Sequence, residues 1–309
     1  MNAPSVRIGW IGTGRMGVAL VDRLIDAGHD VAVHNRTRAK TEALAARGVL
    51  VVDAPSDLAD RDVVFVMVAG SADLLQVLTG PDGLLTRPDV TPQVVIDSST
   101  VSPGASAEAR ARAEERGAQF LAAPVSGNPN VVRAGRLTLA VSGSRATFDR
   151  VRDLLLVLGR GVTYVGEGDV ARLVKICHNV FLGVMIQSLV EITLLAERGG
   201  TSRAAFLEFL NDSVLGSTFT RYKTPALVNL DFTPTFTMPL LSKDFDLAHE
   251  AAHELAVPMP LATAAAQLVA SAVGAGHREL DFATLILEQA RRSGMTLVPE
   301  NAAVDDGLR

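Results

Sequence analysis

The sequence predicts an α/β domain with a mostly parallel sheet, followed by an all-α domain built on one long helix. In the first half, short β-branched apolar runs alternate with helical stretches, which is typical of a parallel sheet with helices on both faces. After residue 166 the apolar residues recur at helical spacing and we predict no further strand. We therefore expect a first domain at residues 1–166, a helical domain at 167–298 and a loose polar tail at 299–309.

The elements of the first half follow in regular order. The predicted strands are residues 8–11, 31–33, 49–52, 63–68, 94–96, 120–121, 137–141 and 162–165. The predicted helices between them are residues 18–27, 38–47, 71–78, 104–116 and 146–158. Ligands of such sheets bind beyond the carboxyl ends of the strands, so the loops at those ends are the first candidates for a site.

The second half begins with a proline-free stretch at residues 169–198, which we read as one long helix. It is apolar on more than one face, which predicts a buried axis of the second domain. Gly199 and Gly200 end it, and the further predicted helices are residues 202–211, 243–255, 261–274 and 282–293.

Composition sets the broad class of the protein. The 309 residues are 48% hydrophobic and 20% charged, with a formal net charge of −5, which argues against a nucleic-acid partner. The single cysteine, Cys177, excludes an intrachain disulfide and favours a reducing, cytoplasmic location. We see no metal-ligand cluster, no signal peptide and no apolar run of about 18–20 residues, so we expect neither a metal nor a membrane.

The segment Gly12-Thr13-Gly14-Arg15-Met16-Gly17 lies between the first predicted strand and helix. In a Rossmann-type fold, Gly12 allows the tight turn, Gly14 lets the pyrophosphate of a dinucleotide approach, and Gly17 lets the helix pack against the strand. The plainer alternative is a glycine turn without a ligand. The position at a strand–helix junction favours the dinucleotide site.

The end of the second strand indicates which nicotinamide cofactor binds. NAD-specific folds place an acidic residue there, on the ribose 2′-hydroxyl. This chain has Asn35-Arg36-Thr37 instead, with no carboxylate to repel a 2′-phosphate. Because a guanidinium suits phosphate, we predict NADP, with NAD as the alternative if Arg36 is only a solvated loop residue.

Two polar stretches and one lysine are further candidates. Residues 97–103 follow a predicted strand, and residues 122–128 contain Ser126 and Gly127, a plausible cradle for a carboxylate. Alone, each is more often a turn than a site. Lys175 lies early in the long helix, with Asn179 one turn later; near a domain junction it could act as an acid or base, although a surface lysine is the commoner explanation.

Together these motifs resemble the β-hydroxyacid dehydrogenase family, over roughly residues 7–293. The glycine loop is followed by the family's D-x-S-T-x-S-P block at Asp97 to Pro103 and its A-P-V-S-G block at Ala123 to Gly127. A glycine, lysine and asparagine block then matches at Gly166, Gly168, Lys175 and Asn179, and a late K-D pair at Lys243.

The resemblance implies a role for each matching residue. Lys175 would be the general acid or base, Asn179 would hold the substrate oxygen, and Ser126 and Gly127 would bind a small carboxylate substrate. Thr100, Val68, Ala69 and Lys243 would line the cofactor site. The family also implies a homodimer formed through the helical domain.

The chain departs from the family pattern at Ala122, usually Asp, and at Asn128, usually Gly, which bears on the substrate more than on the chemistry. The predicted function is interconversion of a short β-hydroxy acid and its semialdehyde or keto acid. The alternatives are an imine reductase, which typically lacks the lysine, and a non-catalytic NADP-binding module.

Overall fold

The computed structural model describes residues 6–308, and the chain divides into two compact units, Met1–Lys175 and Ile176–Arg309. The division falls inside the long helix, whereas the sequence places a domain boundary before it, at residue 166.

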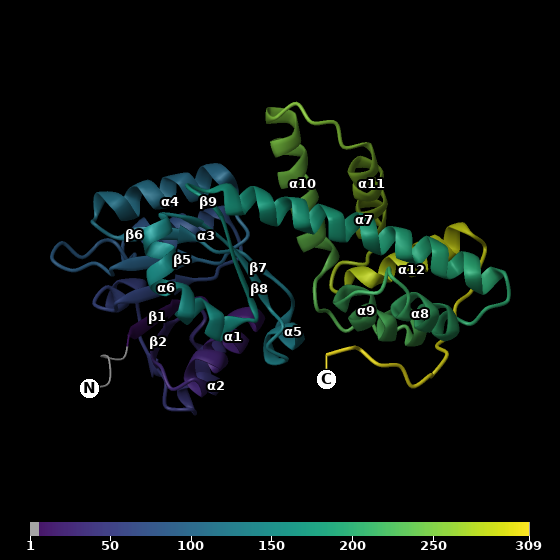
Figure 1. The fold of residues 1–309 in the computed structure, drawn as a ribbon, viewed down its shortest axis with the longest axis horizontal. Coiled ribbons are helices and arrows are strands. Elements are labelled where there is room, and N and C mark those ends of the chain that lie inside the picture. The colour runs from purple at the N-terminus through teal and green to yellow at the C-terminus, as the bar shows by residue number, and fades with distance from the viewer. Residues whose placement is uncertain (1–5, 309) are drawn as a thin grey trace. The chain divides into compact units, whose positions relative to one another are not determined.

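The first unit contains a nine-stranded sheet with helices on both faces (Figure 1). The strand order is β3-β2-β1-β4-β5-β6-β8-β7, and β9 pairs with β8. Strands β1 to β6 are parallel, whereas β8 runs antiparallel to both β6 and β7, so the sheet is mostly parallel as predicted. The strands are β1 (Arg7–Ile11), β2 (Asp30–His34), β3 (Leu50–Val51), β4 (Val63–Val66), β5 (Val94–Asp97), β6 (Gln119–Ala122), β7 (Val125–Ser126), β8 (Thr138–Gly143) and β9 (Gly161–Gly166).

Alternate residues of the central strands enter two different cores, one on each face of the sheet. On β4, Val63 and Phe65 join the core under α1 (Arg15–Asp26) and α6 (Arg145–Leu158). Val64 and Val66 join the core under α3 (Ser71–Thr79) and α4 (Pro103–Glu115). Side chains of a strand point alternately to its two faces, and with both faces buried the strand reads as a continuous apolar run.

Several short elements were not predicted or differ from the prediction. The predicted helix at 38–47 is a 3₁₀ turn, η1 (Arg38–Thr41), followed by α2 (Glu42–Ala45). The turn η2 (Pro55–Leu58), strand β7 and helix α5 (Pro129–Arg133) were missed. Elements of two to five residues are too short to leave a periodic signal in the sequence.

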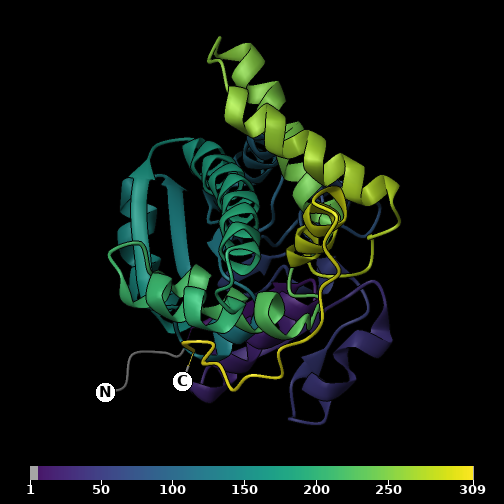
Figure 2. The same ribbon diagram turned by 90° about the vertical axis from the view of Figure 1, so that its right-hand side faces the viewer.

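Helix α7 (Val170–Arg198) runs without a break, as predicted (Figures 1 and 2). The expectation of a buried axis holds only in part, because Ile186 and Val190 lie in the core of the second unit while Phe181 and Leu195 are exposed. Within residues 6–308, α7 alone is long and apolar enough to cross a membrane, but half of its most apolar window is buried. A core helix of a soluble protein passes the same test, so this is weak evidence for a membrane span.

The second unit is helical, and Thr237 and Asp281 form an isolated β-bridge within it. Its remaining elements are α8 (Arg203–Asp212), α9 (Thr218–Asn229), α10 (Met238–Glu254), α11 (Pro260–Gly274), η3 (Phe282–Thr284) and α12 (Leu285–Arg292). Helices α10 and α11 pack side by side (Figure 2). The sequence missed α9, which tolerates Pro225 in its interior, and began α10 five residues late.

The C-terminal segment is bound to the second unit, so the prediction of a loose tail is wrong. The carboxylate of Glu300 accepts hydrogen bonds from the backbone N–H groups of Arg203 and Ala204 at the start of α8, at 2.7 and 3.0 Å. Asn229 and Ala302 exchange two further hydrogen bonds. A helix start leaves unpaired N–H groups, and here a carboxylate about a hundred residues away satisfies them.

Candidate active site

The glycine loop has a backbone shape that two of its glycines make possible. β1 ends at Ile11 and α1 begins at Arg15. Gly12 has a φ of +101°, and a Cβ there would lie 2.1 Å from the carbonyl oxygen of Met67. A Cβ on Gly17 would lie 2.0 Å from the carbonyl oxygen of Gly12. Both contacts are with backbone that cannot move aside, so the fold itself requires these two glycines.

Gly14 differs because the protein leaves space around it. It is exposed, and a Cβ there would meet no described atom within 4 Å. It is the N-cap of α1, without a side-chain cap and without an acidic residue in the first turn. The hydroxyl of Thr13 is buried and has no hydrogen-bond partner in the described part of the chain. An uncapped helix start beside an unfilled approach fits the pyrophosphate of a dinucleotide.

Asn35 braces this loop from the end of β2. Its Oδ1 accepts a hydrogen bond from the backbone N–H of Thr13 at 2.9 Å, and its Nδ2 donates to the carbonyl of Thr37, also at 2.9 Å. The sequence assigned Asn35 to the cofactor, and the structure shows a role in fixing the loop. At the preceding residue, burial lowers the pKa of His34, which favours its neutral form.

Arg36 and Arg38 each have an acidic partner in space. Arg36 Nη1 lies 3.1 Å from Asp73 Oδ1, at the start of α3, and Arg38 pairs with Asp53. The expectation that no carboxylate stands near the end of β2 is therefore wrong. Asp73 and Asp53 lie 37 and 15 residues away in the chain, so no local sequence pattern announces them.

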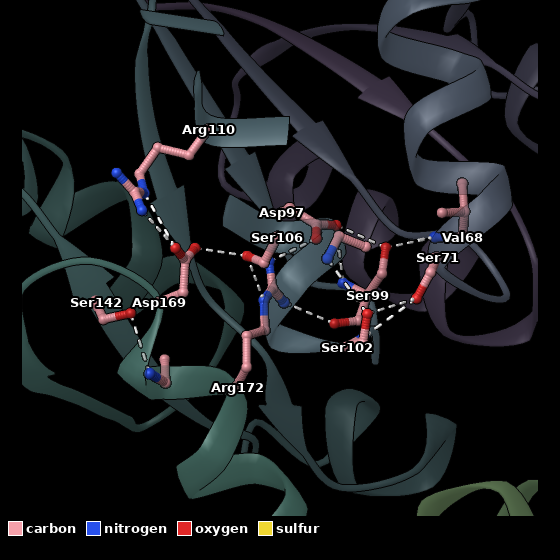
Figure 3. Close-up of polar contacts among 12 residues, drawn as sticks. Val68, Ser71, Asp97, Ser99, Ser102, Ser106, Arg110, Ser142, Asp169 and Arg172 are labelled. Carbon is pink, nitrogen blue, oxygen red and sulfur yellow. Dashed lines mark hydrogen bonds and ion pairs between the residues drawn. The ribbon is translucent and has the colours of Figure 1, made fainter. Parts of the chain in front are cut away.

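The ends of β4 and β5 form one hydrogen-bonded platform (Figure 3). Asp97, fully buried at the end of β5, accepts from the backbone N–H of Ser99 at 3.0 Å and from its hydroxyl at 2.6 Å. The same Ser99 oxygen accepts from the N–H of Val68 at 2.9 Å. The platform thus holds the backbone of Val68 to Ser99, which precedes Thr100 in the chain, and the carbonyl of Met67 lies against Gly12 of the glycine loop.

Arg172, in the first turn of α7, binds this platform through Asp97 and the carbonyl of Ser99. The sequence analysis missed it, because its partner Asp97 lies 75 residues away. Both side chains are buried, and Arg172 Nη2 lies 2.6 Å from Asp97 Oδ2. Figure 3 shows the guanidinium pointing at residues 97–101, the segment at the end of β5 that we call the β5 loop.

The predicted carboxylate cradle follows β7. Ser126 is half-buried, and Gly127 has a φ of +146°, where a Cβ would come within 2.8 Å of Val131. Asn128 is the N-cap of α5, and its Oδ1 accepts from the N–H groups of Asn130 and Val131. Asn128 carries a side-chain oxygen that the family's usual glycine lacks, and this oxygen caps helix α5.

Lys175 is half-buried on α7, and Asn179 lies one turn further along the same helix. Within the second unit, Asn179 is buried, and its Nδ2 donates to Asp244 Oδ2 of α10 at 2.5 Å. His178 Nδ1 lies 3.0 Å from Asn179 Oδ1. Lys243 precedes Asp244 on α10 and is half-buried. The roles of Lys175, Asn179, Ser126, Gly127 and Lys243 in a reaction stay predictions.

Among residues 6–308, no three His, Cys, Asp or Glu side chains are grouped so that they could hold a metal ion.

Comparison with known families matches both halves of the chain. Residues 7–166 match the family model for the NAD-binding domain of 6-phosphogluconate dehydrogenase. Residues 166–288 match the model described as NAD-binding of NADP-dependent 3-hydroxyisobutyrate dehydrogenase. Both models concern nicotinamide-dinucleotide binding, which agrees with the glycine loop.

Individual proteins give the same result. The 2-(hydroxymethyl)glutarate dehydrogenase of Eubacterium barkeri is 30% identical over 92% of this chain and 96% of its own length. The solved 3-hydroxyisobutyrate dehydrogenase of Mycobacterium tuberculosis with L-serine is 29% identical, with a TM-score of 0.80, covering 92% of this chain and 99% of that one. The imine reductase of Myxococcus stipitatus with NADP⁺ is 25% identical, with a TM-score of 0.55, over 90% of this chain and 98% of that one.

A nicotinamide-dinucleotide-binding oxidoreductase is the class that this fold and loop define. The chain belongs to the β-hydroxyacid dehydrogenase family, whose named relatives are NAD(P)-dependent hydroxyacid dehydrogenases and reductases. The imine reductase resembles it less closely in fold.

Proposed function

We propose that this chain is an NADP-preferring dehydrogenase that interconverts a short β-hydroxy acid and its semialdehyde or keto acid. The observation that carries the proposal is the retention of Lys175 and Asn179, one turn apart on α7, in a chain whose relatives along nine-tenths of its length are hydroxyacid dehydrogenases.

The residues present fit the cofactor. The N–H groups at the start of α1 would hold the pyrophosphate above Gly14, and Val68, Ala69 and Thr100 would lie along the nicotinamide half. Arg36 would bind the 2′-phosphate through its planar guanidinium. When bound, the cofactor supplies or accepts the hydride.

The chain's own residues would handle binding and the proton. Ser126 and the N–H of Gly127 would hold the substrate carboxylate, and Asn179 would hold the reacting oxygen. In reduction, the ammonium of Lys175 would give a proton to the carbonyl oxygen; in oxidation, neutral Lys175 would take the hydroxyl proton. Fixing the substrate at both ends converts a bimolecular encounter into an oriented reaction.

An initial-rate panel followed by NADPH absorbance tests the reaction class. It compares 3-hydroxyisobutyrate, 3-hydroxypropionate, D-glycerate and L-serine, with their carbonyl partners, against a cyclic imine. We expect turnover on a β-hydroxy acid pair, with a higher kcat/KM for the NADP form than for the NAD form. Turnover on the imine alone would overturn the proposal, and tight NADPH binding without any turnover would identify a non-catalytic binding module.

Lys175→Ala tests the acid–base assignment. We expect kcat to fall by about 10²- to 10⁴-fold, the usual contribution of general acid–base catalysis, while the Kd for NADPH stays unchanged. Val174→Ala, a substitution at the exposed neighbour on the same helix, is the matched control and should leave kcat intact. Near-normal turnover of Lys175→Ala would remove this lysine from the mechanism.

We also propose a homodimer formed through the helical unit. Large apolar side chains are exposed on the second unit, and a dimer interface formed there would remove them from water. They include Phe181, Leu195, Phe209, Val214 and Leu215. Sedimentation at micromolar concentration should give twice the chain mass of 32.6 kDa; the mass of one chain would refute the dimer.

A cytoplasmic location is proposed from the single cysteine, Cys177, which is exposed. Fractionation of the source cells tests it.

A further inference from the structure

Arg172 is a buried cation whose three guanidinium nitrogens are all used. Its side chain is 1% exposed. Nε donates to the hydroxyl of Ser106 at 2.9 Å, Nη1 to the carbonyl of Ser99 at 2.8 Å, and Nη2 to Asp97 at 2.6 Å. Taking both charges of such a pair out of water is expensive, so stability alone is a weak reason for it.

The contacts of Arg172 continue into the loops expected to hold the cofactor. One carboxylate oxygen of Asp97 accepts a hydrogen bond from Arg172, and the other accepts from the N–H and the hydroxyl of Ser99. The hydroxyl oxygen of Ser99 in turn accepts a hydrogen bond from the N–H of Val68. An unbroken chain of hydrogen bonds therefore joins the first turn of α7 to the ends of β5 and β4 (Figure 3).

Residues around Arg172, including its partner Ser106, also hold the start of α7. Asp169 accepts from the Ser106 hydroxyl at 2.7 Å and from Arg110 Nη2 at 2.8 Å. Ser142 of β8 donates to the carbonyl of Gly168 and accepts from the N–H of Ala171. The helix start is therefore held to α4 and to the sheet, and its register is set at more than one point.

Lys175 lies three residues after Arg172, about 4.5 Å further along the helix axis. Because a helix is stiff over one turn, a displacement of Arg172 relative to Asp97 is passed to Lys175. We propose that Arg172 is a positioning residue: its ion pair with Asp97 sets the place of Lys175 relative to the loop that carries Thr100. This inference rests on the proposed function, in which Lys175 moves the proton.

The test compares Arg172→Lys with Arg203→Lys in the full-length enzyme. Lysine keeps the charge but replaces the planar three-point fork with a single ammonium. Arg203 is the matched control, because it is also fully buried, in the second unit, where it contacts Glu197 and the carbonyl of Val228. Asp97→Asn, which is isosteric, repeats the test if Arg172→Lys does not fold.

Two readouts separate positioning from general stability. Amide hydrogen exchange of the apo protein should become at least about tenfold faster at both residues 97–101 and residues 170–175 in Arg172→Lys, and at neither in Arg203→Lys. At a temperature where each variant is folded, kcat of Arg172→Lys should fall by about 10- to 100-fold, as expected for a displacement approaching 1 Å. The Kd for NADPH should stay within about threefold, and the deuterium isotope effect on kcat from 4-deuterated NADPH should rise.

The outcomes distinguish the two proposals. Turnover on the cyclic imine alone would overturn the proposed function. Near-normal turnover of Lys175→Ala on a β-hydroxy acid would leave that function standing but remove Lys175 from the mechanism, and the positioning role of Arg172 with it. An inactive Lys175→Ala together with unchanged kcat and isotope effect in Arg172→Lys would overturn the positioning role alone. Faster exchange confined to residues 170–175 would also overturn it, because it would show that the β5 loop does not depend on Arg172.

Discussion

Gly14→Ala separates cofactor binding from folding more cleanly than any other change in the glycine loop. At this position an added Cβ meets no described protein atom within 4 Å, and the φ of −68° suits alanine. We therefore expect little effect on the free protein, at most about 1 kcal/mol from replacing a glycine N-cap. The methyl group would instead occupy the approach to the N–H groups of α1.

The expected loss of affinity follows from the bonds that the methyl group would block. A hydrogen bond to a charged phosphate is worth about 1.5–3 kcal/mol. Losing one such bond weakens binding by roughly 10- to 100-fold, since about 1.4 kcal/mol corresponds to tenfold. Gly17→Ala should behave differently, because its Cβ would lie 2.0 Å from a backbone oxygen and would destabilise the apo protein as well.

The assay is NADPH fluorescence titration together with thermal unfolding of the apo protein. Gly104→Ala is the matched control, since Gly104 also lies at a helix start with open space for a Cβ but is not in the glycine loop. It should change neither the Kd nor the unfolding temperature appreciably. Wild-type affinity in Gly14→Ala would refute the placement of the pyrophosphate at this helix start.

Two other changes test the cofactor preference and the core of the second unit. Asp73→Asn frees Arg36 from its ion pair and removes a negative charge that would repel the 2′-phosphate, so the ratio of kcat/KM for NADPH to that for NADH should rise a few-fold. Asp53→Asn, which frees Arg38, is the control. An equal ratio in both variants would contradict the role of Arg36. Burial alone would raise the pKa of Asp281, but the charge of Lys223 and the surrounding hydrogen bonds lower this pKa overall. The ionised Asp281 therefore stabilises the fold fully above its unfolded pKa of about 4, and this stabilisation is lost as the pH falls through its lower pKa in the folded protein. Asp281→Asn should therefore cost about 3–5 kcal/mol in urea unfolding at pH 7 and flatten the acid dependence, whereas parallel pH profiles would contradict this.

The alternation of strands and helices in the first unit and the glycine loop were predictable because their signals are local. A central strand such as β4 is buried on both faces and therefore reads as a continuous β-branched run. Gly12 has a φ of +101°, which favours glycine at that single position, so the residue type itself signals the turn. The long α7 likewise follows from 29 residues of helical spacing without proline.

What the sequence missed depends on partners that are far apart in the chain. Arg172 and Asp97 are 75 residues apart, and nothing near either residue signals the other. Asp73 reaches Arg36 in the same way. Pro225 argues locally against α9, yet burial of Leu227 and Val228 in the core outweighs the lost hydrogen bond.

The attachment of Glu300 to the start of α8 has a consequence for synthesis on the ribosome. All nine strands of the first unit have been made by residue 166, so its sheet can assemble early. Arg203 is fully buried, but the Val298 carbonyl and Glu300 that contact it are translated 95 and 97 residues later. At about 5–20 residues per second, translating residues 167–300 takes roughly 7–27 s. During that time the nascent helical unit lacks the Glu300 carboxylate, and a chain released before residue 300 would leave the buried Arg203 without this partner.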